Sequence, residues 1–336
     1  MTKIQLSLPN HPYTIYLDEG LLDDFSSYLS SIDDIVIITD SGIPKKYITT
    51  VQKQLNDPLI YTIVAGEDSK NIRNYQEIIE TMITANIPKS ATIIALGGGV
   101  VGDLAGFIAS TYMRGISFIQ IPTTLLAQID SSVGGKVAVN SHSAKNAIGS
   151  FFQPDAVFID PNVLSTLEPK QLHSGIAELV KYGVIKDPSI LEILEKDDLS
   201  EQFSTLILKA VKIKRDIVLK DEFDQGIRHI LNYGHTIGHA IEQHSNYQYL
   251  HGESVAIGMA FMAKKTSFYS RLISILQKYD LPFESPYNLN ELIPYLLKDK
   301  KIQKTKLHFI VVEKLGEATI KPIMLTKLKQ YLEELS

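Results

Sequence analysis

Residues 91–106 read ATIIALGGGVVGDLAG, and this segment decides the fold of the first half of the chain. Residues 92–96 are a short apolar run with β-branched members, which is typical of a buried strand. Three glycines follow, and apolar residues then recur at helical spacing over residues 100–110. Free backbone N–H groups and the positive end of the helix dipole would point to one spot, so the segment predicts a phosphate cradle.

Gly97, Gly99 and Gly102 fit the pattern G-x-G-x-x-G, which indicates a dinucleotide. The alternative is a glycine-rich turn that only packs a helix on a sheet. The ordinary dinucleotide fold has an acidic residue about 20 positions further on, but residues 118–121 contain no carboxylate. We therefore expect a ligand that is not held in the ordinary Rossmann way.

The composition is that of a globular protein with 336 residues, enough for about two domains. A net charge of −5 argues against nucleic acid as a general partner. The sequence has no apolar run of membrane-spanning length, and residues 1–11 have no signal-peptide core. Without cysteine, disulfides and thiolate metal sites are excluded, so we expect a cytoplasmic enzyme.

Predicted strands and helices alternate along the first half. Helices are expected at 21–29, 72–85 and 100–110, between strands at 4–8, 13–17, 35–39, 60–64, 92–96, 117–121 and 157–160. This order predicts an α/β, Rossmann-like domain with a mostly parallel sheet and helices on both faces. Pro154 and Pro161 flank the last strand, which places the domain boundary near residue 160.

The second half, residues 161–336, is predicted to be mainly helical. Residues 165–168 fit a capping box, with Pro169 in the first turn of the helix that follows. Further helices are expected at 201–219, 226–243, 254–272 and 325–335, with one late strand at 307–312.

Polar residues after two predicted strands are candidate binding groups. Asp40 could accept hydrogen bonds from ribose hydroxyls or cap the helix after Gly42, and the cap is favoured without other information. Two glycines before Lys136 let the backbone approach a ligand closely. Lys145 and Asn146 follow in a loop-rich segment, where solvated surface lysines are the alternative to an anion site.

Arg228, Asn232, His235 and His239 are spaced by four, three and four residues within the predicted helix at 226–243. This spacing predicts one polar stripe on that helix. A solvated face is the alternative, but a buried polar row without a ligand would be costly. We therefore expect the stripe to line a site.

Histidine and carboxylate are the ligands left for a zinc-type site, and catalytic sites of this kind use three protein ligands. His235, His239 and His251 fall within one window of 17 residues. Glu178 and Lys181 share a face of an earlier predicted helix. His235 and His239 could both bind metal as an i,i+4 pair, or one could serve the substrate. Periodicity does not decide between these possibilities.

Six segments carry a resemblance to a known family, in order and with its spacing. They are GGGVVGDLAGFIASTYMRG from 97, IPTTLLAQIDSSVGGK from 121, KNAIGSFFQP from 145, SGIAELVKYG from 174, LNYGHTIGHAIE from 231 and LHGESVAIGM from 250. Together they resemble the 3-dehydroquinate synthases of the shikimate pathway, which are sugar-phosphate cyclases. The resemblance runs from residue 35 to about residue 301 and implies a dehydroquinate synthase-like fold.

The resemblance implies one divalent metal, zinc or cobalt, on Glu178, His235 and His251, with His239 left for substrate. It also implies catalytic NAD. The residues expected to contact NAD are Asp40, Glu67, Lys70, Gly98, Gly99, Val100, Asp103, Thr123, Thr124, Lys136, Lys145 and Thr166. Asp40 would then take the ribose role of the missing downstream acid.

The implied substrate is 3-deoxy-D-arabino-heptulosonate 7-phosphate, which becomes 3-dehydroquinate and phosphate. The residues implied in substrate binding or catalysis are Arg114, Asp130, Lys136, Asn146, Lys181, Lys214, Arg228, Asn232 and His239. Within this set Lys214 and Arg228 would bind the carboxylate. Arg114 would reach the phosphate at the neighbouring site of a homodimer, and Lys300 or Lys301 would add a phosphate contact.

Val137 and Ala138 depart from the pattern, because the family commonly has Thr-Gly there. Alanine tolerates fewer backbone angles than glycine, so a small repacking of this loop is expected. Three other functions remain as alternatives. They are a sister cyclase acting on another sugar phosphate, a metal-dependent polyol dehydrogenase that releases NADH, and a non-catalytic NAD-binding or regulatory protein.

Overall fold

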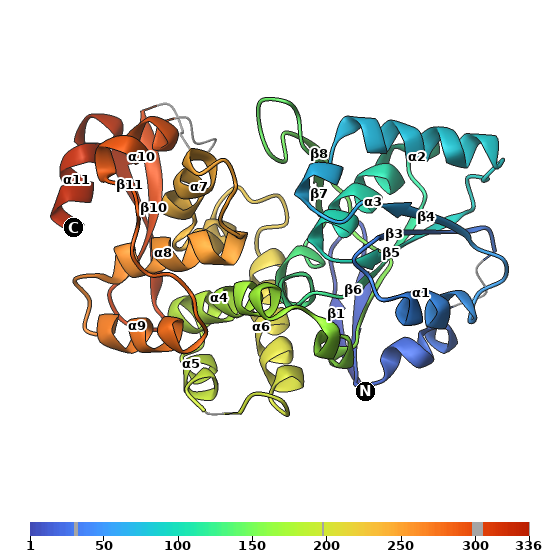
Figure 1. Ribbon diagram of the computed structural model, residues 1–336, viewed down its shortest axis with the longest axis horizontal. Coiled ribbons are helices and arrows are strands. Elements are labelled where there is room, and N and C mark those ends of the chain that lie inside the picture. Colours follow the sequence, from blue (N-terminus) through green and yellow to red (C-terminus); the bar gives the residue numbers. More distant parts are fainter. Residues whose placement is uncertain (30–32, 197, 298–304, 336) are drawn as a thin grey trace. The chain divides into compact units, whose positions relative to one another are not determined.

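The computed structural model describes residues 1–29, 33–196, 198–297 and 305–335 (Figure 1). The chain divides into two compact units. Unit 1 comprises Met1–Leu167 and Lys214–Phe223, and unit 2 comprises Glu168–Ile213 and Asp224–Ser336. The sequence suggested a single cut near residue 160, whereas the structure groups the last turn of α6 (Phe203–Val218) with unit 1. None of the described helices is long and apolar enough to cross a membrane.

Unit 1 is built on a seven-stranded sheet in the order β1-β2-β9-β6-β5-β3-β4. Only β1 and β2 pair antiparallel in this sheet, and the other neighbours are parallel, which confirms the predicted sheet. The strands are β1 (Thr2–Leu6), β2 (Tyr13–Leu17), β3 (Ile35–Asp40), β4 (Leu59–Ile63), β5 (Thr92–Gly97), β6 (Ser117–Pro122) and β9 (Ala156–Ile159).

Both faces of the sheet are covered, because successive side chains of a strand point to opposite faces. Val36 and Ile38 of β3 pack in a core with α2 (Ile72–Thr84) and α3 (Gly99–Thr111). Their neighbours Ile35 and Ile37 pack in a second core with α1 (Lys45–Gln52). Figure 1 shows α2 and α3 on one side of the sheet and α1 on the other. Complete burial of each such side chain contributes about 1.5–3 kcal/mol.

A two-stranded hairpin of β7 (Lys136–Val139) and β8 (Ile148–Phe151) was not predicted from the sequence. Its Val137 is buried against α3, where a Cβ at Gly106 would overlap the Val137 side chain. Ala138 lies within β7 and pairs with Gly149. The Val-Ala pair therefore fits an extended strand that packs on α3.

The predicted helix at 21–29 is wrong, because the segment forms two 3-10 turns, η1 (Leu21–Asp23) and η2 (Phe25–Tyr28). Asp24 separates them with a φ of −144° and a ψ of 25°. The carboxylate of Asp160 accepts hydrogen bonds from the backbone N–H groups of Gly20 and Leu22. This tertiary contact stabilises the short turns.

In its described residues, unit 2 is mainly helical, with one antiparallel hairpin. Its helices are α4 (Pro169–Ile185), α5 (Ser189–Leu194), most of α6, η7 (Ile227–Asn232), α7 (His235–His244), α8 (His251–Ala263), α9 (Tyr269–Lys278), α10 (Leu289–Leu296), η8 (Leu325–Lys327) and α11 (Leu328–Leu335), and its hairpin pairs β10 (Lys306–Val312) with β11 (Ala318–Met324). The described elements of unit 1 also include short helical turns. They are η3 (Glu67–Ser69), η4 (Tyr112–Arg114), the π-helical turn η5 (Ala127–Ser131) and η6 (Pro161–Thr166).

The single helix predicted at 226–243 is wrong. Gly234 has a φ of 77° and separates η7 from α7. A left-handed backbone conformation favours glycine and ends a right-handed helix. Arg228 and Asn232 therefore lie on η7, while His235 and His239 begin a new helix, so the four residues do not form one helical stripe.

Two other predicted boundaries also differ. The helix predicted at 254–272 begins at His251, ends at Ala263, and is followed by α9. The predicted capping box before Pro169 does not form, since the N-cap of α4 is Glu168 without a side-chain hydrogen bond.

Candidate active site

Three helices of unit 2 bring Glu178, His235 and His251 together. Nε2 of His235 lies 3.4 Å from Oε1 of Glu178, and Nε2 of His251 lies 3.5 Å from the same oxygen. Two ligand atoms of a tetrahedral zinc site, with bonds of roughly 2.0–2.2 Å, are about 3.4 Å apart. The carboxylate and two imidazoles therefore fit a divalent cation in both donor type and spacing.

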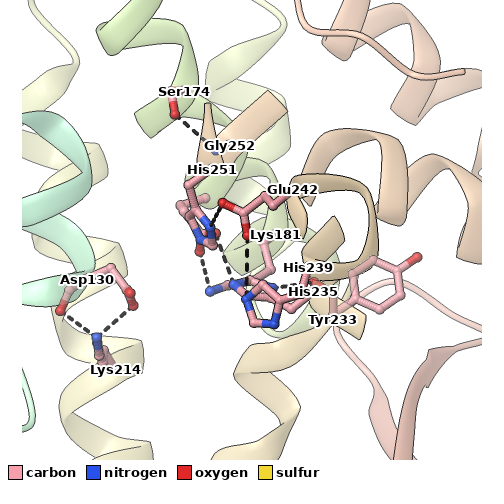
Figure 2. Close-up of polar contacts among 11 residues, drawn as sticks. Asp130, Ser174, Lys181, Lys214, Tyr233, His235, His239, Glu242, His251 and Gly252 are labelled. Carbon is pink, nitrogen blue, oxygen red and sulfur yellow. Dashed lines mark hydrogen bonds and ion pairs between the residues drawn. The ribbon is translucent and has the colours of Figure 1, made fainter. Parts of the chain in front are cut away.

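Small residues hold these helices close enough for the ligands to meet. A Cβ at Gly252 of α8 would overlap the carbonyl of Ser174 on α4. A Cβ at Gly258 of α8 would likewise overlap the carbonyl of Gly234, just before α7. The Ser174 hydroxyl also accepts a hydrogen bond of 3.0 Å from the Gly252 backbone N–H (Figure 2). Each ligand consequently sits near a close contact between helices.

Glu178 and Lys181 are both almost completely buried on α4. Oε2 of Glu178 contacts the Lys181 ammonium, while Oε1 faces the two imidazoles. The two oxygens of one carboxylate thus have different surroundings. Since an isolated buried charge is expensive, Lys181 compensates part of the Glu178 charge.

His235 is fixed by the backbone just before its own helix. Its Nδ1 lies 3.0 Å from the Tyr233 carbonyl oxygen. A carbonyl only accepts, so Nδ1 donates the hydrogen bond and Nε2 is left as the possible metal ligand. The hydroxyl of the buried Tyr233 has a pKa above its usual range because it is desolvated.

His251 lies between two carboxylates. Its Nε2 faces Glu178, and its Nδ1 lies 3.5 Å from Oε1 of Glu242 on α7 (Figure 2). Burial lowers the pKa of His251, but the hydrogen bonds and charges of Glu178 and Glu242 outweigh burial and raise it to about 10. Sequence reasoning missed Glu242, although its i,i+3 spacing from His239 places both residues on one face of α7.

The remaining predicted residues of unit 2 differ in their exposure. The ring centre of His239 lies 5.5 Å from that of His235, and its side chain is 36% exposed. It is therefore accessible to a ligand from outside the helix packing. Arg228 is buried and Asn232 half-buried on η7. Lys300 and Lys301 lie outside the described residues.

The glycine turn of unit 1 has the predicted strand–turn–helix form. Gly98 is the N-cap of α3, and Val100 lies in its first turn. A Cβ at Gly98 would lie 3.0 Å from Thr124, and one at Gly99 would lie 3.1 Å from Ser131. The backbone N–H of Thr123 donates a hydrogen bond to the Gly97 carbonyl. Helix N-terminus and strand end thus form a backbone cradle of the kind that accepts a phosphate.

Lys70 is the cation of a buried polar cluster in unit 1. Its Nζ lies 3.0 Å from Asp103 and 3.2 Å from Glu67. Burial lowers the pKa of Lys70, but Asp103 and Glu67 outweigh burial and raise it above its usual value. Burial raises the pKa of Asp103, and the charge of Lys70 offsets this only in part. These three residues, all predicted NAD contacts, form one charge cluster.

Asn140 joins that cluster to a second predicted group. Its Nδ2 donates a 2.8 Å hydrogen bond to Glu67, and its backbone N–H donates to the Lys70 carbonyl. Its Oδ1 accepts a 2.9 Å hydrogen bond from the backbone of Asn146. Asn140 was not predicted from the sequence, because none of these three contacts follows from local spacing.

Asp40 ends β3, and its carboxylate accepts a 2.8 Å hydrogen bond from the backbone N–H of Gly42. It does not cap α1, whose N-cap is Pro44, so the helix-capping interpretation is wrong. Burial raises the pKa of Asp40, against the hydrogen bonds from Gly42 and Ile43. Asp40 instead stabilises the turn at the carboxyl end of a central strand.

Asp130 and Lys214 form an ion pair within unit 1. Nζ of Lys214 lies 2.7 Å from Oδ1 of Asp130 and also contacts the Asp130 carbonyl (Figure 2). Lys214 is buried, whereas the Asp130 side chain is 27% exposed. The pair holds the lysine in one orientation.

The other predicted residues of unit 1 are more accessible. Arg114, Lys136 and Asn146 are exposed, and Lys145 is half-buried. The backbone φ values of Arg114 and Asn146 are 67° and 50°, a left-handed conformation that is uncommon for residues other than glycine. Thr166 is exposed on η6, and its hydroxyl donates to Tyr47 or to the Val163 carbonyl.

Comparison with known proteins gives a consistent result. Residues 60–174 match the family model described as 3-dehydroquinate synthase N-terminal, and residues 175–302 match the one described as 3-dehydroquinate synthase C-terminal. The chain is 41% identical to a 3-dehydroquinate synthase of Streptococcus thermophilus, over 99% of this chain and 100% of that protein.

Two solved structures resemble the fold over nearly the whole chain. One is 2-deoxy-scyllo-inosose synthase in complex with carbaglucose-6-phosphate, NAD+ and Co2+. Its TM-score is 0.85 and its sequence identity 27%, and the match covers 99% of this chain and 100% of that chain. The other is 2-epi-5-epi-valiolone synthase of Streptomyces hygroscopicus with NAD+ and Zn2+ bound. Its TM-score is 0.86 and its sequence identity 25%, and the match covers 98% of both chains.

Proposed function

The chain belongs to the 3-dehydroquinate synthase family, and on this premise we propose that it converts 3-deoxy-D-arabino-heptulosonate 7-phosphate into 3-dehydroquinate and phosphate. This reaction belongs to the shikimate pathway. The observation that carries the proposal is the group of Glu178, His235 and His251, whose spacing fits a divalent cation. The predicted cytoplasmic location stays a prediction.

We assign Glu178, His235 and His251 to a zinc or cobalt ion, and the glycine turn of unit 1 to NAD. When bound, the metal supplies a Lewis acid for a substrate hydroxyl, and NAD supplies a reversible hydride acceptor. The donor set supports a cation, and the N-terminus of α3 supports a dinucleotide phosphate. The full set of NAD contacts predicted from the resemblance is proposed with it.

Cationic side chains are assigned to the two anionic ends of the substrate. Lys214 and Arg228 bind the carboxylate, and both are buried, which strengthens their interaction with an anion. Lys136, Asn146, Asn232 and His239 bind the phosphate. The active form is a homodimer, in which the partner's Arg114 adds a phosphate contact. Asp130 orients Lys214 through its ion pair, and Lys181 holds Glu178.

A sister cyclase is the second candidate, because both solved neighbours are named as synthases of other products. A sugar phosphate without a carboxylate would leave Lys214 and Arg228 without an anionic partner on the substrate. The buried Arg228 and the buried Lys214, which Asp130 orients, offer two positive charges to a substrate carboxylate, and this favours the heptulosonate substrate.

The test follows phosphate release and NADH absorbance together in one reaction. With the heptulosonate phosphate, we expect stoichiometric phosphate, catalytic NAD and no net NADH. With glucose 6-phosphate in place of that substrate, we expect no phosphate release. Accumulation of NADH without phosphate would identify a dehydrogenase, and turnover of glucose 6-phosphate would identify a sister cyclase.

A further inference from the structure

Glu242 is a buried carboxylate on α7 that the roles above leave unused. Its side chain is 6% exposed, and its two oxygens face two different histidines. Oε1 lies 3.5 Å from Nδ1 of His251, and Oε2 lies 4.0 Å from Nε2 of His239 (Figure 2). Glu242 therefore stands between a predicted metal ligand and a predicted substrate contact.

The two metal-binding histidines are held in the same way by different acceptors. Nδ1 of His235 donates to the neutral carbonyl of Tyr233, and Nδ1 of His251 faces the charged carboxylate of Glu242. Both rings consequently present Nε2 to Glu178, at 3.4 Å and 3.5 Å. An acceptor at Nδ1 selects the ring orientation and the tautomer, and an anionic acceptor also makes the imidazole a stronger ligand.

We propose that Glu242 is a positioning residue for the metal centre, which holds His251 with Nε2 toward the ion and strengthens it as a ligand. The proposal rests on the metal assignment made above. Because Oε2 of the same carboxylate faces His239, Glu242 also links the orientation of the metal ligand to that of the substrate contact.

A direct ligand role for Glu242 is the competing interpretation, since His239, Glu242 and His251 form a second group with ligand spacing. His251 would have to offer Nδ1 to that group. A neutral imidazole has only one nitrogen free to bind a cation. His251 could therefore join both groups at once only as an imidazolate bridging two cations, so the positioning role is favoured.

The experiment uses the full chain, stripped of metal by a chelator and titrated with Co2+ in competition with that chelator. The titration is repeated over a range of pH, so that weaker proton competition in the variants is separated from weaker metal ligation. Glu242→Gln keeps an acceptor for Nδ1–H but removes the charge, and Glu242→Ala removes both. Outer carboxylates of this kind contribute about 10–100-fold to metal affinity. We expect a loss of about 10-fold for Glu242→Gln and a larger loss, toward about 100-fold, for Glu242→Ala.

Asp280→Asn is the matched control. Asp280 also faces a histidine of unit 2, with 3.8 Å between its Oδ2 and Nδ1 of His173, but it is 87% exposed. We expect this variant to bind Co2+ like the unaltered chain. The visible spectrum of bound Co2+ should keep its band positions and intensity in Glu242→Gln, because the ligands themselves are unchanged.

Two results would overturn the proposal. Equal Co2+ affinity in both Glu242 variants and the unaltered chain would show that Glu242 does not support the centre. A changed Co2+ spectrum in Glu242→Gln would identify Glu242 as a ligand. The proposed function is tested separately: an unaltered chain that binds Co2+ tightly but releases no phosphate from the heptulosonate would refute that function and leave the role of Glu242 standing.

Discussion

Unit 1 and unit 2 each contain a cluster of charged side chains with a buried lysine, but the cluster of unit 2 also contains imidazoles. In unit 1, Lys70 lies between Asp103 and Glu67. In unit 2, Glu178 and Glu242 face imidazoles, and His251 has a pKa raised to about 10.

The Lys70 ammonium keeps its proton at neutral pH, because its pKa lies above the ordinary value of a lysine. An imidazole exchanges its proton for a metal, because metal ligands must be deprotonated. The unit 1 cluster is therefore complete in the chain alone, whereas the charge of the unit 2 cluster depends on pH and on metal. Changes that alter one cluster and leave the other intact therefore distinguish the two.

Removal of a metal ligand should affect unit 2 alone. We expect His235→Ala to lower metal affinity by more than about 100-fold, beyond the range of an outer residue, and to abolish phosphate release. NAD affinity, measured by fluorescence titration, should stay within about twofold, since its predicted contacts lie elsewhere. His142→Ala, at an exposed histidine of unit 1, is the control. Full metal occupancy in His235→Ala would reject His235 as a ligand.

Removal of the unit 1 cation should give the opposite pattern. Lys70→Met leaves Asp103 and Glu67 close together without their cation. Because Glu67 is 36% exposed and Asp103 17% exposed, we expect a loss of about 1–3 kcal/mol of unfolding free energy, below that for a fully buried pair. Urea unfolding measures this loss, with the exposed Lys89→Met as control. NAD affinity should also fall, while the Co2+ affinity of the folded protein stays unchanged. A variant as stable as the unaltered chain would contradict the importance of this cluster.

A conservative change at Arg228 tests the substrate assignment. Arg228→Lys keeps the charge but loses the planar fork that binds a carboxylate through two hydrogen bonds. We expect kcat/KM for the heptulosonate phosphate to fall about 10-fold, and NAD affinity to change much less. Arg73→Lys, at an 87% exposed side chain, serves as control. Equal losses in substrate and NAD binding would count against the assignment.

Metal binding should release about one proton near neutral pH. The metal-free His251 has a pKa of about 10, above its ordinary 6.5, so it carries a proton at pH 7 that the cation displaces. Co2+ affinity should consequently rise about tenfold per pH unit between pH 7 and 9, and level off as the pH approaches that pKa. Calorimetry in buffers of different ionisation enthalpy counts the proton. An affinity independent of pH would contradict the charge difference between the clusters.

Much of unit 1 could be predicted from local patterns. The alternation of buried strands and helices, and the turn after residues 92–96, follow from periodicity and glycine placement. In unit 2 the pattern failed at Gly234, where a positive φ interrupts the predicted helix. In unit 1 the pattern failed at residues 21–29, because the hydrogen bonds of Asp160 favour short turns over a helix.

The residues of the candidate site could likewise be predicted only in part. The absence of cysteine restricted the metal ligands to histidine and carboxylate, and the family resemblance named Glu178, His235 and His251. Residue spacing alone could not choose between His235 and His239. Asn140 was missed because its contacts with Glu67 and Lys70 join residues that are far apart in sequence. Glu242 was missed because its contact with His251 joins two different helices, although its spacing from His239 was visible in the sequence.

The sequence by itself determined the kinds of ligand, the order of strands and helices, and the positions where glycine permits a close approach. The tertiary structure decided which groups meet, such as Glu178 with two histidines from later helices and Glu242 with His251. The physical reason is the distance along the chain over which each effect acts. Backbone propensities and side-chain spacing act within about one helical turn, roughly four residues. Distances between helices are set by how their surfaces pack, as Gly252 against Ser174 illustrates.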